Sequence, residues 1–312
     1  MNDVIPEGEA VRLFTVPITP ELATAAAAIL KRFRELADEC LRVVDPEAFA
    51  QITDSLFRKE NAELNQLSEP LRGERHNLHA LLLETAELTK DNALDHVRAL
   101  EHDLLMQPPP VWSPLTLSRV AMEGVVFSEY LLDPAIPLNR RLARVAGMWR
   151  TDAVYAQKQG EAHGHEPAEA GQMLAYVENA LRRCQAVERH NAKGKLGGYS
   201  FGSESAPLDI NITERVAKAM PVWLPAPYRL TSGAAHNRPW MIGKAKDLAG
   251  GEGLVGEAAT VMAAVMISMG AVETVVRVFG EYFAVDVSEG LRTMEEERKA
   301  FLYEAIGIAH GQ

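Results

Sequence analysis

The sequence predicts an all-α protein built as a multi-helix bundle, and three observations lead to that fold class. Aromatic residues make up only 6% of the 312 residues, whereas alanine runs recur, as at 25–28 and 258–259. Small and aliphatic side chains suit closely packed helices, because strands favour β-branched and aromatic residues. Long stretches carry apolar residues at helical spacing, and none alternates with a period of two, so strands are expected to be few or absent.

Residues 1–106 are expected to form an N-terminal helical section. Thr19-Pro20-Glu21 combines an N-cap, a proline in the first turn and an early acid, which together predict the start of a helix. Three consecutive prolines at 108–110 cannot continue a helix and mark the end of the section. The predicted helices cover residues 20–44, 46–67 and 69–106. The last range is expected to be one helix, or two with the break at 90–92.

Residues 111–312 are expected to form a second helical domain, or to continue the first as one domain. Ser113-Pro114 supplies an N-cap and a proline at the first helical position. The apolar segment 256–283 contains Glu257, Glu273 and Arg277, so we expect a buried core helix and no membrane span. The predicted helices are 113–132, 137–159, 168–189, 213–220, 227–237, 256–283 and 288–306.

Charge and cysteine content restrict the function classes. The formal net charge is −11, which disfavours general binding to nucleic-acid backbones but allows a local basic cleft. Only Cys40 and Cys184 occur, too few for a disulfide framework, and no signal peptide is visible at the N-terminus. We therefore expect a cytoplasmic protein.

The segment 228–236, Tyr-Arg-Leu-Thr-Ser-Gly-Ala-Ala-His, carries the main candidate site. On a helix, seven residues complete nearly two turns, so Arg229 and His236 point the same way, about 10 Å apart along the axis. Ser232 lies between them on that face. Arginine supplies a fixed positive charge, and histidine exchanges a proton near neutral pH. Together they are a minimal set for RNA cleavage without metal.

This spacing resembles the R-x(4–6)-H motif of the HEPN superfamily, all-helical proteins frequent in toxin–antitoxin and phage-defence systems. The segments 113–134 and 228–240 are also similar to a pattern in uncharacterised bacterial, particularly actinobacterial, helical proteins. The resemblance covers roughly residues 111–285. It implies a HEPN-like helical core in the C-terminal two thirds of the chain.

The resemblance also implies a function, a metal-independent ribonuclease in stress or phage defence, with RNA as its partner and no cofactor. Arg229 would stabilise the phosphate, and His236 would act as acid or base in a homodimer formed through the Tyr228–His236 helix. Tyr228, Ser232 and Asn237 would orient the pair.

Two other interpretations of this helix stay open. Leu230 stands where the superfamily usually has a polar residue, and many superfamily members are non-catalytic. Tyr228, Arg229 and His236 would then form a buried hydrogen-bond network in a helical binding or scaffold protein. A small-molecule enzyme would instead show an apolar cavity capped by a few polar groups.

The segment 190–207 is expected to be a basic, glycine-rich loop. With the arginine before it, it supplies Arg189, Lys193 and Lys195 as candidate ligands for RNA phosphates or a substrate anion. An ordinary solvated loop is the alternative.

No metal or cofactor site is predicted. The histidines at 163 and 165 share a short loop, but a di-iron bundle requires Glu-x-x-His pairs on facing helices, and none occurs. The segment 251–256 matches GxGxxG, yet the residues before it are polar and unlike a buried strand. Dinucleotide binding is therefore not expected.

Overall fold

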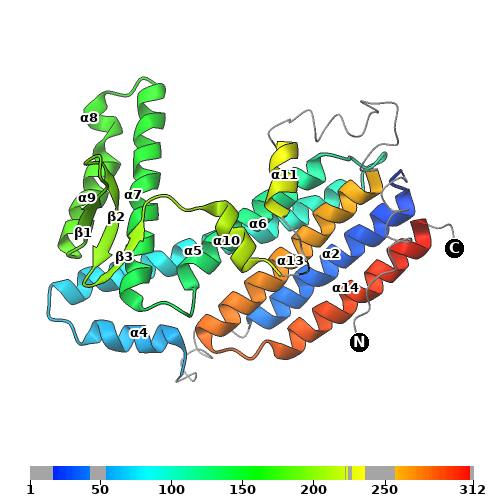
Figure 1. The fold of residues 1–312 in the computed structure, drawn as a ribbon, viewed down its shortest axis with the longest axis horizontal. Coiled ribbons are helices and arrows are strands. Elements are labelled where there is room, and N and C mark those ends of the chain that lie inside the picture. Colours follow the sequence, from blue (N-terminus) through cyan, green and yellow to red (C-terminus); the bar gives the residue numbers. More distant parts are fainter. Residues whose placement is uncertain (1–16, 43–53, 222, 224–226, 236–256, 310–312) are drawn as a thin grey trace.

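The computed structural model describes residues 17–42, 54–221, 223, 227–235 and 257–309, and the predicted helical bundle is confirmed (Figure 1). The helices are α2 (Pro20–Leu41), α4 (Leu56–Asn65), α5 (Leu71–Leu104), α6 (Ser113–Leu132), α7 (Leu138–Ala162), α8 (Pro167–Ala170), α9 (Gln172–Arg183), α10 (Ile212–Ala219), α11 (Pro227–Ala235), α13 (Glu257–Phe283) and α14 (Ser288–Ala309). The strands are β1 (Val187–His190), β2 (Leu196–Phe201) and β3 (Glu204–Pro207). The predicted GxGxxG segment, 251–256, lies outside the described residues.

The N-terminal helices follow the local signals of the sequence, with one exception. The Thr19 hydroxyl accepts a hydrogen bond from the Leu22 amide at 3.2 Å, so the predicted N-cap of α2 is confirmed. Of the one or two helices expected over 69–106, the structure has one, because α5 continues through 90–92 without a break. These residues include neither glycine nor proline, and the Lys90 ammonium lies 5.3 Å from the ring centroid of Phe279. Polarity alone therefore does not end the helix.

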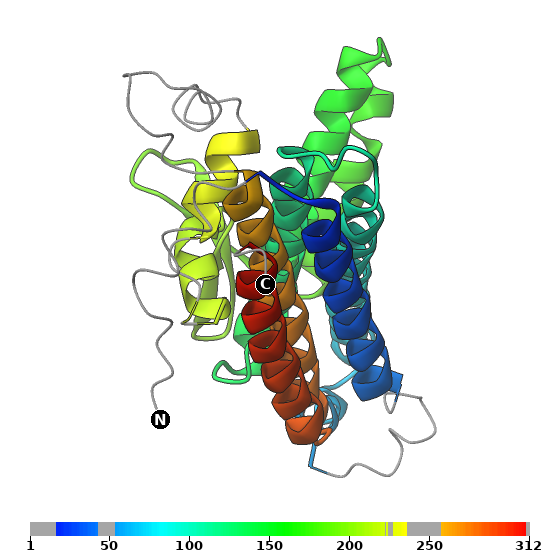
Figure 2. The same cartoon turned by 90° about the vertical axis from the view of Figure 1, so that its right-hand side faces the viewer.

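The helix α13 lies in the middle of the bundle, beside α2 and α14 (Figures 1 and 2). By length and composition it is the one described helix that could cross a membrane, and 78% of its most apolar window is buried inside the protein. The expected buried core helix is thus confirmed. The hydrophobic core draws on helices from both sides of the prolines at 108–110.

The helices α5 and α6 approach each other closely at a glycine. A Cβ built on Gly124 would lie 2.8 Å from the Thr89 carbonyl oxygen, closer than such atoms can pack. Four residues further along α6, the Ser128 hydroxyl donates to the Ala86 carbonyl at 3.0 Å. Glycine at 124 therefore sets the distance between two helices that carry much of the core.

The segment 190–207 is an antiparallel sheet, with strand order β1-β2-β3, and the expectation of a loop is wrong. Tyr199 and Phe201 on β2 are buried, and the sheet packs against α7. A Cβ on Gly198 would overlap the Ala206 carbonyl, so glycine at this position is needed for β2 and β3 to pair closely. The glycine content that suggested a loop is therefore part of the sheet.

The helices α7, α8 and α9 and the sheet form an arm beside the bundle (Figure 1). The single helix predicted over 168–189 is two helices, α8 and α9. The helix α9 ends at Arg183, and the chain then turns at Gln185, where φ is +57°. Arg189 accordingly lies on β1. The helix α10 leads from the arm back to the bundle, where it contacts α6 and α11.

Candidate functional site

The helix α11 contains part of the segment that the sequence singles out. Tyr228 and Ser232 are half-buried on it, and Arg229 lies between them in sequence, although the side chain of Arg229 is outside the described part of the structure. His236 and Asn237 lie outside the described residues altogether. The predicted pairing of Arg229 with His236 therefore stays a prediction.

Tyr228 attaches α11 to α6. Its hydroxyl accepts a hydrogen bond from Arg119 Nη2 at 3.2 Å, and the same guanidinium lies 5.1 Å from the ring centroid. Arg119 Nε in turn bonds to Glu123 at 2.7 Å. This arrangement places a second arginine beside the segment, one that motif reasoning did not include.

The candidate anion-binding residues of the basic segment lie elsewhere. Arg189 is on β1, and Lys193 and Lys195 belong to the turn that follows, where both backbone amides donate to Asn191 Oδ1. All three side chains are exposed. They lie on the arm, away from α11 (Figure 1), so the structure does not bring them near Tyr228 or Ser232.

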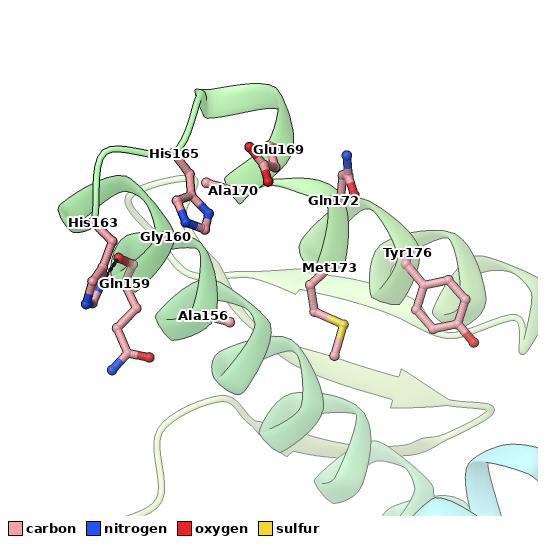
Figure 3. A pocket seen from close by; sticks show the side chains of 10 residues that line it. All are labelled: Ala156, Gln159, Gly160, His163, His165, Glu169, Ala170, Gln172, Met173 and Tyr176. Carbon is pink, nitrogen blue, oxygen red and sulfur yellow. Dashed lines mark hydrogen bonds between the residues drawn. The ribbon is translucent and has the colours of Figure 1, made fainter.

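The loop histidines border a groove at the far end of the arm, between α7 and α9 (Figure 3). His163 Nδ1 lies 2.8 Å from the Gln159 carbonyl oxygen, and Met173 and Tyr176 are exposed along α9. Among the described residues, no group of three or more potential ligands is positioned to hold a metal ion. The groove therefore offers no metal centre there.

A buried ionic cluster joins four helices. Glu60 of α4 accepts hydrogen bonds from Tyr282 of α13 at 2.6 Å and from Arg141 of α7, and His79 Nε2 of α5 lies 2.9 Å from the same carboxylate. Burial alone would raise the pKa of the Glu60 carboxyl, but these partners outweigh it and hold that pKa below its ordinary value. All four side chains are at most 5% exposed. A cluster sealed in this way fixes packing and does not meet a substrate.

A small cavity where the arm meets the bundle has the chemistry of a binding site. Its volume is about 150 Å³, and its walls come from α6, α7, β3, the β3–α10 connection and the start of α10. The polar residues that line it are Tyr130, Arg140, Arg144, Ser205, Asp209, Asn211, Glu214 and Arg215. Three of these side chains are arginines, in a chain whose net charge is −11.

Tyr130 is the centre of this site. The guanidinium carbon of Arg144 lies 4.2 Å from its ring centroid, and that of Arg215 lies 4.8 Å away, both within range of a cation–π contact. Tyr130 is 3% exposed, and its hydroxyl has no hydrogen-bond partner among the described residues. A buried hydroxyl without a partner costs roughly 1–3 kcal/mol, so a ligand that pairs with it would recover that free energy on binding.

Burial raises the pKa of the Tyr130 phenol, and the charges of Arg144, Arg215 and Arg140 act on it in the opposite direction. The phenol therefore stays protonated at neutral pH and can donate its hydrogen. A protonated phenol without a partner can donate to an acceptor that comes within reach of it.

Two buried acids hold the arginines in place. Asp133 lies 3.6 Å from Arg144 and 3.9 Å from Arg215, and Lys218 donates to the same carboxylate at 2.7 Å. Glu129 lies 3.8 Å from Arg215 and 3.4 Å from Lys218. Burial would raise the pKa of Asp133, but Lys218 and Arg144 hold it below its ordinary value, so the carboxylate stays charged.

Sequence reasoning did not find this cavity. Its residues come from separate stretches near 130, 140–144 and 205–215 and match no local motif. The sequence contained one signal for it, the three arginines at 140, 141 and 144 near the start of a predicted helix. The helix α7 buries two of them, Arg141 and Arg144. No protein-family model, curated protein or solved structure matches the chain, so the cavity is interpreted from its own geometry.

Proposed function

We propose that this protein is a helical binding protein that holds the oxyanion group of a small ligand in the cavity formed by Tyr130, Arg144 and Arg215. One observation carries the proposal, the buried Tyr130 hydroxyl without a partner beside two guanidinium groups that line the same cavity. It develops the alternative that the sequence left open, a non-catalytic binding protein.

The chemistry of these side chains favours a carboxylate or a phosphate. Arginine presents several N–H donors in a planar fork that matches such groups and remains charged when buried. The low local dielectric strengthens each of these bonds, because Arg144 and Tyr130 are nearly excluded from water. A cavity of about 150 Å³ holds a ligand of about six heavy atoms, which is the size of one such group and a short extension.

Titration calorimetry with inorganic phosphate and with acetate tests the proposal and distinguishes the two anions. Tyr130→Phe removes only the hydroxyl. It is expected to weaken binding by about tenfold or more, since a hydrogen bond to a charged group contributes roughly 1.5–3 kcal/mol. Arg215→Gln, at a half-buried position, is expected to weaken binding further.

The matched control is Tyr199→Phe. Tyr199 of β2 is 1% exposed and its hydroxyl likewise has no partner among the described residues, but it does not line the cavity. This variant should bind like wild type. If neither anion binds, or if both tyrosine variants lose the same affinity, the proposal is wrong.

A second candidate is the metal-independent ribonuclease implied by the HEPN resemblance, acting as a homodimer through α11. The observation that favours it is the Arg119 guanidinium beside Tyr228, which adds positive charge next to the predicted pair. The test is cleavage of RNA in the presence of a metal chelator by wild type and His236→Ala, with Ser118→Ala as a control at a buried serine of α6. Equal cleavage by wild type and His236→Ala, or none by either, rules out this pair as catalytic.

A further inference from the structure

The mouth of the cavity carries acidic side chains as well as basic ones. Asp209, on the connection from β3 to α10, and Glu214, in the first turn of α10, both line it and are both exposed. Arg140 of α7 lines it too and is also exposed. Because Tyr130 and Arg144 are buried, the deeper wall presents hydrogen-bond donors, whereas the mouth presents two carboxylates beside one guanidinium.

These mouth charges are not paired with each other. Among the described residues, no ion pair joins Arg140 to Asp209 or to Glu214, although all three border a cavity of only about 150 Å³. Glu214 Oε2 accepts a hydrogen bond from Asn211 at 3.3 Å, so one of its oxygens is occupied. Asp209 has no such partner in the described chain and is free to receive a donor from a ligand.

The charges of the whole site are balanced before any ligand enters. The count takes in the charged side chains that line the cavity, the acids that pair with the lining arginines, and the lysine that pairs with those acids. It gives four basic side chains, Arg140, Arg144, Arg215 and Lys218, and four acidic ones, Glu129, Asp133, Asp209 and Glu214. A bare oxyanion can bind to the donors of the deeper wall, but it brings no positively charged partner to the two acids at the mouth. A ligand that brings one positive and one negative group preserves the balance of charge, with each group meeting the opposite sign.

We infer that the ligand is a small zwitterion of the amino-acid class, bound with its carboxylate towards Tyr130, Arg144 and Arg215 and its ammonium towards Asp209 and Glu214. This inference rests on the proposed function and adds the ammonium end to it. An ammonium group has three donors and no acceptor, which suits two carboxylates at the mouth. Ala206, Pro207 and Ile210 supply the apolar part of the wall, and the volume leaves room for a methyl group but not for a large side chain.

The experiment compares alanine with propionate, which has the same carboxylate and carbon chain but no ammonium group. Affinities are measured by NMR titration of the full chain. Alanine is expected to bind at least about fivefold more tightly than propionate, the effect of exposed ion pairs at the mouth. Inorganic phosphate serves as the third ligand.

Variants at the mouth identify the source of that preference. In Asp209→Asn/Glu214→Gln, alanine and propionate should bind with similar affinity. The glutamine keeps the side-chain geometry of the helix start, so α10 remains capped. Glu188→Gln, an exposed acid on β1 outside the cavity lining, is the control and should retain the preference for alanine.

The outcomes separate the two proposals. If propionate binds through Tyr130 as tightly as alanine, the zwitterion inference is overturned and the oxyanion site stands. If alanine keeps its advantage in the double variant, the mouth acids are not the ammonium site and the inference is likewise overturned. If alanine, propionate and phosphate all fail to bind, the proposed function fails with it.

Discussion

Replacing Glu60 by glutamine should destabilise the protein far more than the loss of one surface ion pair. The substitution keeps the size of the side chain but removes the negative charge that faces Arg141, which is 1% exposed. Breaking a buried ion pair from one side costs about 3–5 kcal/mol, because the remaining charge has neither water nor a partner. The hydrogen bonds from Tyr282 and His79 to the carboxylate would also weaken.

Urea unfolding followed by circular dichroism measures this loss. The control is Glu296→Gln, whose partner Arg292 is 56% exposed, and it should change the free energy of unfolding by less than about 1 kcal/mol. Adding Arg141→Met to Glu60→Gln should recover part of the stability, because it removes the unpaired buried charge. If Glu60→Gln costs no more than Glu296→Gln, the account of a charge-balanced buried cluster is refuted.

Three further predictions concern the pH dependence of the same cluster, a glycine contact between helices and the two cysteines. The folded state holds the pKa of Glu60 below its ordinary value, so its contribution to stability is present above the unfolded pKa, near 4.5, and is lost as pH falls through the folded pKa. Lowering the pH from neutrality to below about 4.5 should therefore reduce the free energy of unfolding by more in wild type than in Glu60→Gln, which lacks the carboxylate. Gly124→Ala should cost about 1–3 kcal/mol through the clash between α5 and α6, whereas Gly307→Ala, which meets nothing within 4 Å, should gain about 0.5 kcal/mol; thermal unfolding compares them. Burial raises the pKa of the Cys184 thiol to about 11, so at pH 8 a thiol reagent should modify Cys40 much faster, and equal rates would contradict the burial of Cys184.

Much of the bundle could be predicted from local signals. The cap at Thr19, the proline at 114 and the apolar run at 257–283 act within a few residues, and each gives a helix close to its predicted position. Two local signals were misleading, the polar residues at 90–92, which a long helix tolerates, and the glycines of 190–207, which allow strands to pair.

The cavity could not be predicted in the same way, because its residues come together only through tertiary packing. Tyr130 and Asp133 end α6, Arg144 lies on the next helix, and Arg215 follows the sheet whose presence the sequence did not indicate. Without the sheet, nothing in the pattern of residues places 205–215 beside α6. The hydroxyl without a partner is likewise visible only once the neighbours of Tyr130 are known.

The most direct test of the binding proposal is to locate an oxyanion in the protein. A crystal grown or soaked with selenate, whose selenium gives an anomalous diffraction signal, shows where a tetrahedral oxyanion is held. The binding proposal predicts a peak in the cavity, within hydrogen-bond distance of the Tyr130 hydroxyl and of the Arg144 or Arg215 guanidinium, and a clearly weaker peak in Tyr130→Phe at the same selenate concentration. A peak only among Arg189, Lys193 and Lys195 on the arm, or an occupied cavity that is unchanged in Tyr130→Phe, would contradict it.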